Sequence, residues 1–345
     1  MKKLIDKLAT EKSLAYDEFC TLLSNFTDAD REYATEIARK EAIENFDNKI
    51  FIRGLIEISS FCKNDCLYCG LRRSNKNAQR YRLSKEKILD CCKTGYELGF
   101  RTFVLQGGED EFYTDDIMCD IVAHIRKKYS DCAITLSLGE KSRESYQNLY
   151  NAGANRYLLR HETADKEHYL KLHPESMSFE NRLRCLNDLK EIGFQTGCGF
   201  MVGSPYQSIQ ALAKDLIFIK DFKPQMVGVG PFIPHKDTPF NNFEHGNLEL
   251  TLFLISLIRI MLPKVLLPST TALGTIDKDG RQLGILAGAN VVMPNLSPEN
   301  VRKKYLLYDN KICTGDEAAE SLKSLKKTMK EIGYEIVVSR GDYEN

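Results

Sequence analysis

The feature that most constrains the fold is an alternation of two hydrophobic periods from about residue 50 onward. Short apolar or β-branched runs are followed by longer amphipathic stretches, the pattern of strand–helix units around a parallel sheet. The runs predict strands at 50–59, 102–106, 133–138, 156–160, 196–202, 226–232, 265–270 and 290–294. Helical patterns lie between them, for example at 84–99, 114–129, 178–193 and 209–222.

Eight strands that alternate with helices predict an α/β fold of the (β/α)8 TIM-barrel type. An open doubly wound sheet is the alternative, but it usually has fewer strands and a glycine-rich dinucleotide turn, and no G-x-G-x-x-G follows the first run. We therefore predict a barrel over residues 50–313. A polar helical extension (1–49) packs against one end of it, and a C-terminal tail (314–345) packs on the barrel with a surface helix at 316–333.

Composition limits the partners and the compartment. The 345 residues include 48 basic and 48 acidic side chains, spread along the chain, so neither a nucleic acid nor a membrane is expected as a partner. The most apolar window, 248–262, is short and contains Arg259, which predicts a buried helix. The eleven cysteines are an odd number without a visible secretory signal, which predicts reduced thiols and a cytoplasmic location.

Three cysteines directly follow the first predicted strand. Cys62, Cys66 and Cys69 have the spacing C-x3-C-x2-C, at the end of a barrel strand where catalytic sites lie. A closed zinc site takes four ligands, usually two C-x2-C pairs, and covalent haem needs C-x-x-C-H, whereas Gly70 follows Cys69. The count favours an iron–sulfur cluster with one open iron, and a zinc site remains the alternative.

Polar side chains at the ends of two other strands are a second indication of a site. Thr135 and Ser137 share one face of the third predicted strand, and Arg160 and Glu162 share a face at the end of the fourth. Barrel strands are buried on both sides, so such groups are costly unless they are paired or bind a ligand. A structural ion pair between Arg160 and Glu162 is the alternative, but the clustering at one end favours a ligand.

The C-x3-C-x-aromatic-C loop resembles that of the radical S-adenosylmethionine (SAM) superfamily. The resemblance implies that Cys62, Cys66 and Cys69 hold a 4Fe-4S cluster whose open iron is chelated by the amino and carboxylate groups of SAM. The reduced cluster then cleaves SAM to a 5′-deoxyadenosyl radical. Tyr68 takes the aromatic position, which lies near the adenine in that superfamily.

Longer stretches resemble the HydE family of FeFe-hydrogenase maturases, above all "RYLLRHETA" at 156–164 and "GPFIPHKDTP" at 230–239. The likeness covers residues 50–313 in order and implies one 4Fe-4S cluster and SAM as cofactors. The residues that it implies for SAM are Tyr68, Gly107, Gly108, Ser137, Glu162, Arg182, Gly199, Met201 and Gly203. Those that it implies for the substrate cavity are Thr135, Arg160, Thr270, Thr271, Met293 and Tyr305.

The same resemblance implies a substrate and partners. The substrate is a small, anionic, cysteine-bound iron carbonyl cyanide complex, which the radical attacks at sulfur during assembly of the two-iron subcluster of the hydrogenase H-cluster. The partners are the other maturases, a radical SAM tyrosine lyase and a GTPase scaffold, and a ferredoxin or flavodoxin as electron donor. Some relatives carry a second cluster near the C-terminus. No cysteine follows Cys313 here, so none is expected.

Other functions stay open at this stage. A methylornithine-forming mutase of the same branch would need a carboxylate for the amine of its substrate, and a biotin-synthase-like enzyme would need an auxiliary cluster. A non-catalytic electron carrier would use four cysteines and would not need polar groups along a barrel.

Overall fold

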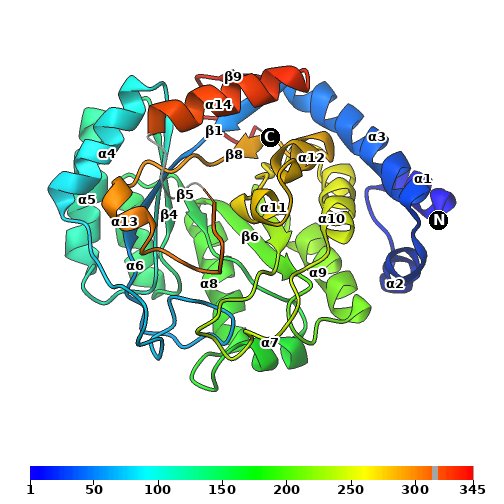
Figure 1. Cartoon of the computed structure of the whole chain (residues 1–345), viewed down its shortest axis with the longest axis horizontal. Helices are drawn as coiled ribbons and strands as arrows, with labels where there is room; N and C mark the ends of the chain where they lie inside the picture. Colours follow the sequence, from blue (N-terminus) through cyan, green and yellow to red (C-terminus); the bar gives the residue numbers. More distant parts are fainter. Residues whose placement is uncertain (313–317, 345) are drawn as a thin grey trace.

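A parallel six-stranded sheet forms the inside of the molecule, in a computed structural model that describes residues 1–312 and 318–344. In sheet order the strands are β2 (Gly54–Ser59), β3 (Thr102–Gly107), β4 (Ala133–Ser137), β5 (Arg156–Leu158), β6 (Gln195–Val202) and β7 (Met226–Pro231). Helices follow the strands and surround them (Figure 1). They are α4 (Lys85–Glu97), α5 (Asp115–Lys128), α6 (Arg143–Asn151), α7 (Lys166–Leu172), α8 (Phe179–Ile192), α9 (Ile209–Phe222) and α10 (Leu248–Met261).

Two irregular segments close the sheet into a barrel. The parallel bridges that complete the ring are Met226–Leu266, Pro268–Val291 and Leu55–Asn295. The predicted barrel is confirmed, but the predicted strand at 265–270 is wrong in detail because it forms only isolated bridges. Pro268 has no amide hydrogen to donate to a neighbouring strand, which explains the irregularity. The last predicted strand is reduced to the two residues of β8 (Val291–Val292).

The first predicted strand is divided at Arg53. Its first part, β1 (Lys49–Ile52), leaves the barrel and pairs in parallel with β8 on one side and with β9 (Glu335–Val337) on the other. The sequence analysis did not predict β9, because three residues are too few to show a period. The strand that precedes the barrel and a strand near the end of the described chain therefore meet in one small sheet.

Three helices precede the barrel: α1 (Lys2–Glu11), α2 (Tyr16–Asn25) and α3 (Asp28–Phe46). The buried face of α3 consists of Ala34, Ala38 and Ala42, whose small side chains allow close packing against α10. Helix α2 packs on α9 in the same way. The extension was predicted to pack against one end of the barrel. It lies instead on the flank of the barrel, against α9 and α10 (Figure 1).

Helix α10 is covered on two sides, by the sheet and by α3, which explains its apolar sequence. Its Arg259 is fully buried and donates to the carbonyl oxygens of Gly288 and Pro263, both at 2.7 Å. The predicted buried helix is confirmed. Among the described residues, no helix is both long and apolar enough to cross a membrane.

The segment after β9 covers the floor of the barrel, by which we mean the amino ends of β3, β5 and β6. Arg156, at the start of β5, is fully buried and donates to the carbonyl oxygens of Arg340 (2.9 Å) and Gly341 (3.0 Å). It also donates to the Asp342 carboxylate at 2.6 Å. The hydroxyl of Thr102, at the start of β3, donates to Arg340 O at 2.8 Å. These bonds attach the end of the described chain to the strands.

Four further helices complete the described structure: α11 (Thr271–Ile276), α12 (Gly280–Leu286), α13 (Glu299–Arg302) and α14 (Ala318–Glu331). Helix α14 confirms the surface helix predicted in the tail. Cys313, where a second cluster was judged absent, lies outside the described residues.

Candidate active site at the carboxyl ends of the strands

A cavity of about 360 Å³ opens at the carboxyl ends of the strands. The predicted site residues that line it are Cys62, Cys66, Tyr68, Cys69, Gly107, Gly108, Ser137, Arg160, Glu162, Arg182, Met201, Thr270, Thr271, Met293 and Tyr305. Residues from the cysteine loop, from or just after the ends of β3, β4, β5 and β6, from α8 and from three later segments therefore meet around one space, as expected for the active end of a barrel.

Three predicted residues do not line the cavity. Thr135 precedes Ser137 by one pleat on the same face of β4 and so lies deeper in the barrel. At Gly199 a Cβ would lie 2.1 Å from the carbonyl oxygen of Gly228, so this glycine allows β6 and β7 to approach each other. Gly203 is exposed and adopts a φ of +74° in the turn after β6. The close approach of β6 and β7 therefore accounts for Gly199, and the conformation of the turn accounts for Gly203.

The cysteine loop is held in shape by its own polar groups. The guanidinium of Arg80 donates to the carbonyl oxygens of Ser60, Leu71, Arg72 and Asn75. The carboxylate of Asp65 accepts from Arg72 Nε at 2.7 Å and from Ser74 Oγ at 2.6 Å. These bonds are made by side chains of the loop itself, so they hold the segment that carries the three cysteines in one shape.

The three cysteine side chains are half-buried within this loop. Burial raises the pKa of all three thiols, that of Cys69 to about 12. The described residues contain no group of three His, Cys, Asp or Glu side chains that would hold a single metal ion. A cubane does not need such convergence, because each thiolate binds a different iron. The donor set, three soft ligands on a rigid loop, therefore fits a 4Fe-4S cluster.

Gly108 is required by the approach of β3 to the cysteine loop. A Cβ at this position would lie 2.2 Å from the carbonyl oxygen of Phe61 and 2.7 Å from Cys62 Cβ. Gly107 has only ordinary contacts, the nearest at 3.4 Å. Of the two predicted glycines, only Gly108 is therefore needed for packing, and it brings a bare backbone against the cysteines.

Glu162 and Arg182 form the next part of the cavity wall. Glu162 is 8% exposed, has a φ of +65°, and its Oε2 has no hydrogen-bond partner among the described residues. A buried carboxylate oxygen without a donor is costly, so this position is suited to a ligand that donates hydrogen bonds. Arg182 donates to Glu140 Oε1 and to the carbonyl oxygen of Arg160, both at 2.6 Å. Two nitrogens of the Arg182 guanidinium therefore already donate hydrogen bonds to the protein.

A buried histidine holds the backbone that carries Arg160 and Glu162. The amide of Gly199 donates to Nδ1 of His161 at 3.2 Å, so Nε2 carries the proton and donates to Asp215 at 3.2 Å. The amide of Glu162 donates to the carbonyl oxygen of Gly199 at 3.0 Å. Burial raises the pKa of Asp215. The pair behind the strand thus fixes the junction from which two site residues project.

Arg160 differs from the other arginines of the site. It lines the cavity beside the backbone of Gly228, where an added Cβ would lie 3.6 Å from its Nε. Within residues 1–312 and 318–344, its guanidinium forms no ion pair and no hydrogen bond. The predicted alternative, an Arg160–Glu162 ion pair, does not form. A cation without a counterion in a cavity is a site for an anion.

Thr270 and Thr271 lie at the start of α11. The hydroxyl of Thr270 accepts the amide hydrogen of Leu273 at 3.4 Å and caps the helix. Its own proton remains available to the cavity.

Among the cavity residues that the sequence analysis missed, two form a buried ion pair. Glu57 of β2 is 1% exposed and forms an ion pair with Lys311. It also accepts from Asn295 Nδ2 at 2.9 Å, and Lys311 donates to the carbonyl oxygen of Tyr305 at 3.0 Å. The sequence could have indicated Glu57, because it is a charged residue within the apolar run "GLIEIS" of a strand that is buried on both sides. Nothing in the sequence pointed to Lys311.

Tyr68 is held by a histidine. His173 Nδ1 lies 3.0 Å from the carbonyl oxygen of Tyr169 and donates to it, so His173 Nε2 accepts from the Tyr68 hydroxyl at 3.2 Å. Burial lowers the pKa of His173 to about 3, so the ring is neutral. The phenol between two of the cysteines is therefore fixed in direction.

Comparison with known proteins identifies relatives of this chain. The profile of the Radical SAM superfamily matches residues 56–219. The [FeFe] hydrogenase maturase subunit HydE of Thermotoga maritima is 46% identical over 308 residues, which cover 89% of this chain and 86% of the relative. The 3-methylornithine synthase of Methanosarcina acetivorans is 30% identical and covers 96% of each chain. The crystal structure of methylornithine synthase (PylB) superposes with a TM-score of 0.85 at 29% identity, over 97% of each chain.

Proposed function

Because this chain belongs to the radical SAM superfamily and resembles the HydE maturase over most of its length, we propose that it acts in FeFe-hydrogenase maturation. It is an enzyme that uses a 4Fe-4S cluster and SAM. Its proposed substrate is a small, anionic, cysteine-bound iron carbonyl cyanide complex, a precursor of the two-iron subcluster. Its proposed partners are the other maturases and a ferredoxin or flavodoxin.

The chain's own residues have separate parts in this proposal. Cys62, Cys66 and Cys69 ligate the cluster, and with SAM bound the cluster supplies a 5′-deoxyadenosyl radical. The residues proposed to contact SAM are Tyr68, Gly107, Gly108, Ser137, Glu162, Arg182 and Met201. The unpaired Oε2 of Glu162 accepts hydrogen bonds from SAM, and the bare backbone at Gly108 lets the cofactor lie close to the cysteine loop.

The observation that carries the substrate proposal is the lone guanidinium of Arg160 inside the cavity. An anionic complex would neutralise this charge and accept hydrogen bonds from it, which are stronger than those between neutral groups. Thr270 and Thr271 line the same cavity as Arg160, and their hydroxyl groups can donate hydrogen bonds to the same anion. Met293 and Tyr305 supply apolar surface around it.

A methylornithine-type reaction is the second candidate, since two of the relatives described above catalyse it. Its amino-acid substrate would need a carboxylate for an amine. Glu57 is a carboxylate at the right depth, but Lys311 already neutralises it. The unpaired guanidinium of Arg160, together with the pairing of Glu57, therefore supports an anionic substrate over an amine.

The test is an anaerobic turnover assay with reconstituted cluster, SAM and a reductant. We expect consumption of SAM coupled to consumption of the cysteine-bound iron complex, and no product from lysine. Arg160→Met should lower consumption of the iron complex at low concentrations of the complex but keep the brown cluster. If lysine were rearranged and the iron complex ignored, the maturase proposal would be wrong.

A further inference from the structure

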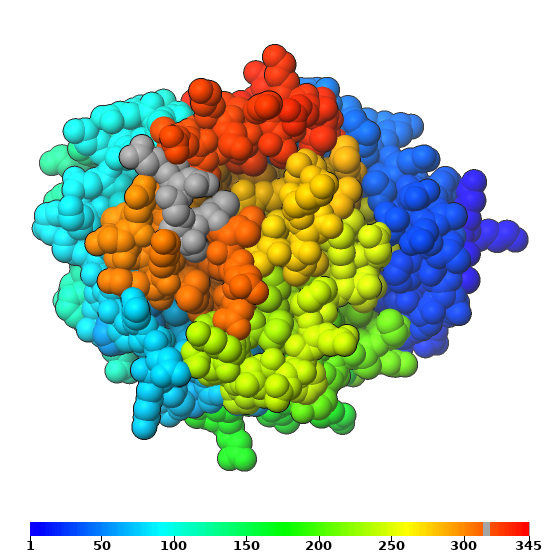
Figure 2. Space-filling view, in the orientation of Figure 1, coloured from blue at the N-terminus to red at the C-terminus, as the bar shows by residue number. Residues whose placement is uncertain are grey.

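The outer side of the cysteine loop carries a basic surface that the proposed reaction does not use. A pocket of about 280 Å³ lies there, and its lysines are Lys236, Lys303 and Lys304. Arg73 and Lys76 are exposed on the adjoining loop. We call these five side chains the basic surface. Figure 2 shows the three segments that carry them side by side, in blue (about 70–80), yellow-green (about 236–245) and orange (about 303–311).

The positive charge of this surface is largely uncompensated. Asp237 also lines the pocket and accepts from Asn77 Nδ2 at 2.8 Å, and Asp309 accepts from the backbone amide of Lys236 at 2.8 Å. The structure shows no ion pair for the five basic side chains within residues 1–312 and 318–344. Five cations thus face two carboxylates. Such an excess attracts negatively charged proteins over distances of about a Debye length, roughly 10 Å.

The basic surface is also close to the cluster through the chain. Gly70, which directly follows Cys69, lies in the floor of the pocket. A Cβ at Gly70 would lie 2.2 Å from Leu306 O and 2.4 Å from His235 Cδ2, so three segments converge on this one residue. Its amide donates to Leu307 O at 2.9 Å. A partner at the pocket would therefore be separated from a cluster ligand by little more than one residue of backbone.

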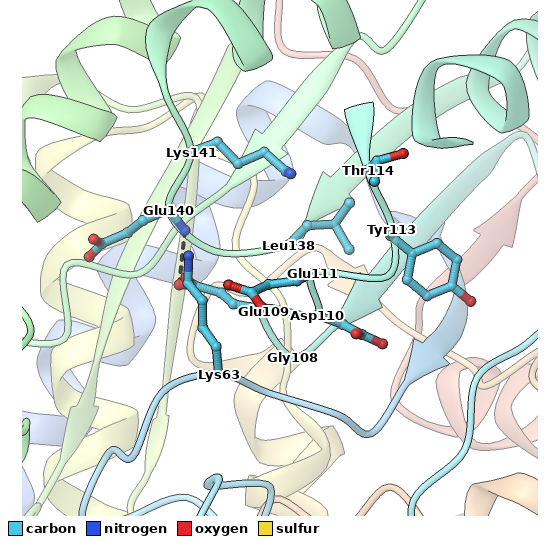
Figure 3. A pocket seen from close by; sticks show the side chains of 10 residues that line it. All are labelled: Lys63, Gly108, Glu109, Asp110, Glu111, Tyr113, Thr114, Leu138, Glu140 and Lys141. Carbon is cyan, nitrogen blue, oxygen red and sulfur yellow. Dashed lines mark hydrogen bonds and ion pairs between the residues drawn. The ribbon is translucent and has the colours of Figure 1, made fainter. Parts of the chain in front are cut away.

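A second pocket beside the cysteine loop lacks this excess of positive charge. Figure 3 shows this pocket, which has a volume of about 320 Å³ and is lined in part by Gly108 and Lys63. Its carboxylates are Glu109, Asp110, Glu111 and Glu140, and three of them form ion pairs: Glu109 with Lys63, Asp110 with Arg82, and Glu140 with Arg182. Of the two pockets, the one at the basic surface is therefore the one that offers unpaired positive charge to a negatively charged protein.

We propose that the basic surface is the docking site of an acidic one-electron carrier protein, which reduces the cluster through the Cys69–Gly70 backbone. The inference rests on the proposed function, which requires one electron per SAM cleaved. In the step the carrier loses one electron and the cluster gains it, and no bond forms or breaks. Electron-transfer partners commonly have small, transient interfaces, so a compact charged patch is sufficient.

The experiment measures cluster reduction directly. Reduced flavodoxin, an acidic carrier, is mixed with the reconstituted full-length enzyme at low ionic strength, and bleaching of the cluster absorbance is followed by stopped flow. We expect Lys303→Glu/Lys304→Glu to slow reduction by flavodoxin at least about tenfold, since electrostatic steering changes association rates by about 10 to 10³. Reduction by photoreduced deazaflavin, a small molecule that needs no docking surface, should be unchanged.

Lys127→Glu/Lys128→Glu on α5 is the matched control, with the same change in net charge on an outer helix. It should leave both rates at the wild-type value. Milder Lys236→Ala should slow only the flavodoxin reaction, by a smaller factor. Equal slowing in the α5 control, or no slowing in Lys303→Glu/Lys304→Glu, would overturn the assignment. SAM cleavage with deazaflavin is measured separately, so that a failure of the proposed function is seen independently of docking.

Discussion

Two arginines at the two ends of one strand, Arg156 at the start of β5 and Arg160 two residues beyond its end, have opposite surroundings. Arg156 begins β5 at the barrel floor, is fully buried, and is bonded to two carbonyl oxygens and the Asp342 carboxylate. Arg160 lies two residues after the end of β5, at the mouth of the barrel, and has no such partner among the described residues. The floor thus uses its charge to hold the chain together, whereas the mouth leaves a charge unmatched for a ligand.

The difference extends to the neighbours of the two residues. At the floor Gln195 Oε1 accepts from Arg156 Nε at 3.1 Å and Thr102 is bonded to Arg340. At the mouth Glu162 keeps an unpaired, buried oxygen. Unmatched groups cost folding free energy, so those that line the cavity at the mouth indicate a place for a ligand. The floor is not fully matched either, because the buried Nε and Nη2 of Arg53 have no partner among the described residues. Charge in a barrel strand is therefore informative only once its end of the strand is known.

The largest effect should come from the cysteine loop. Cys62→Ala should abolish cluster assembly and all SAM cleavage, because two thiolates do not hold the cubane. The iron content and the cluster absorbance of anaerobically purified protein measure this. Cys92→Ala, a buried thiol of α4, is the control and should retain the cluster. Normal iron in Cys62→Ala would exclude Cys62 as a ligand.

At the floor, Arg156→Met should lower the free energy of unfolding by about 3–5 kcal/mol, because it leaves the buried partners of a paired charge without a donor. Arg160→Met should change it by less than about 1 kcal/mol. Denaturant unfolding of the apo-protein measures both. Similar losses in the two variants would remove the contrast between floor and mouth.

At the mouth, Arg160→Met should weaken binding of the iron complex by about 1.5–3 kcal/mol, the range for a hydrogen bond to a charged group. Arg160→Lys should restore part of this, since the charge returns without the fork. The KM for the complex is the measurement, with SAM affinity as the internal control. A fall in SAM affinity alone would move Arg160 to the cofactor.

The smallest effect is the dependence of stability on pH at the floor. Burial raises the pKa of Asp342, but the Arg156 and Arg340 guanidinia outweigh it, so the folded pKa lies below the ordinary value. The carboxylate therefore stabilises the fold above pH of about 4, and the contribution disappears as the pH falls through the folded pKa. The stability difference between wild type and Asp342→Asn should be constant from pH 7 to about 4 and shrink below it.

The sequence predicted the parts of the site that depend on local pattern. The cysteine spacing and the polar residues at strand ends are visible within a few positions, and the cavity brings most of them together. Glu57 obeyed the same rule and was overlooked. The pairing of Lys311 with Glu57 joins positions 254 residues apart and has no local signal. Long-range partners of this kind follow from topology and not from spacing.

The fold was predicted to a similar extent. Alternation fixed the barrel, because period and order are local properties. The break at Arg53, the irregular segment around Pro268 and strand β9 depend on which neighbours are available, and short elements carry no period. The flank position of α1–α3 depends on the face of α3 that carries the small side chains of Ala34, Ala38 and Ala42. This spacing is present in the sequence, but the sequence analysis did not interpret it as a packing surface.

The pairing of β1 between β8 and β9 has a consequence for biosynthesis. Ile50 and Ile52 of β1 leave the ribosome early, and both partner strands are translated near the end of the message. Until then the nascent chain displays an apolar strand with two open edges, a template for association with other chains. Chaperones in excess, which cover an exposed apolar strand, should therefore raise the yield of soluble protein.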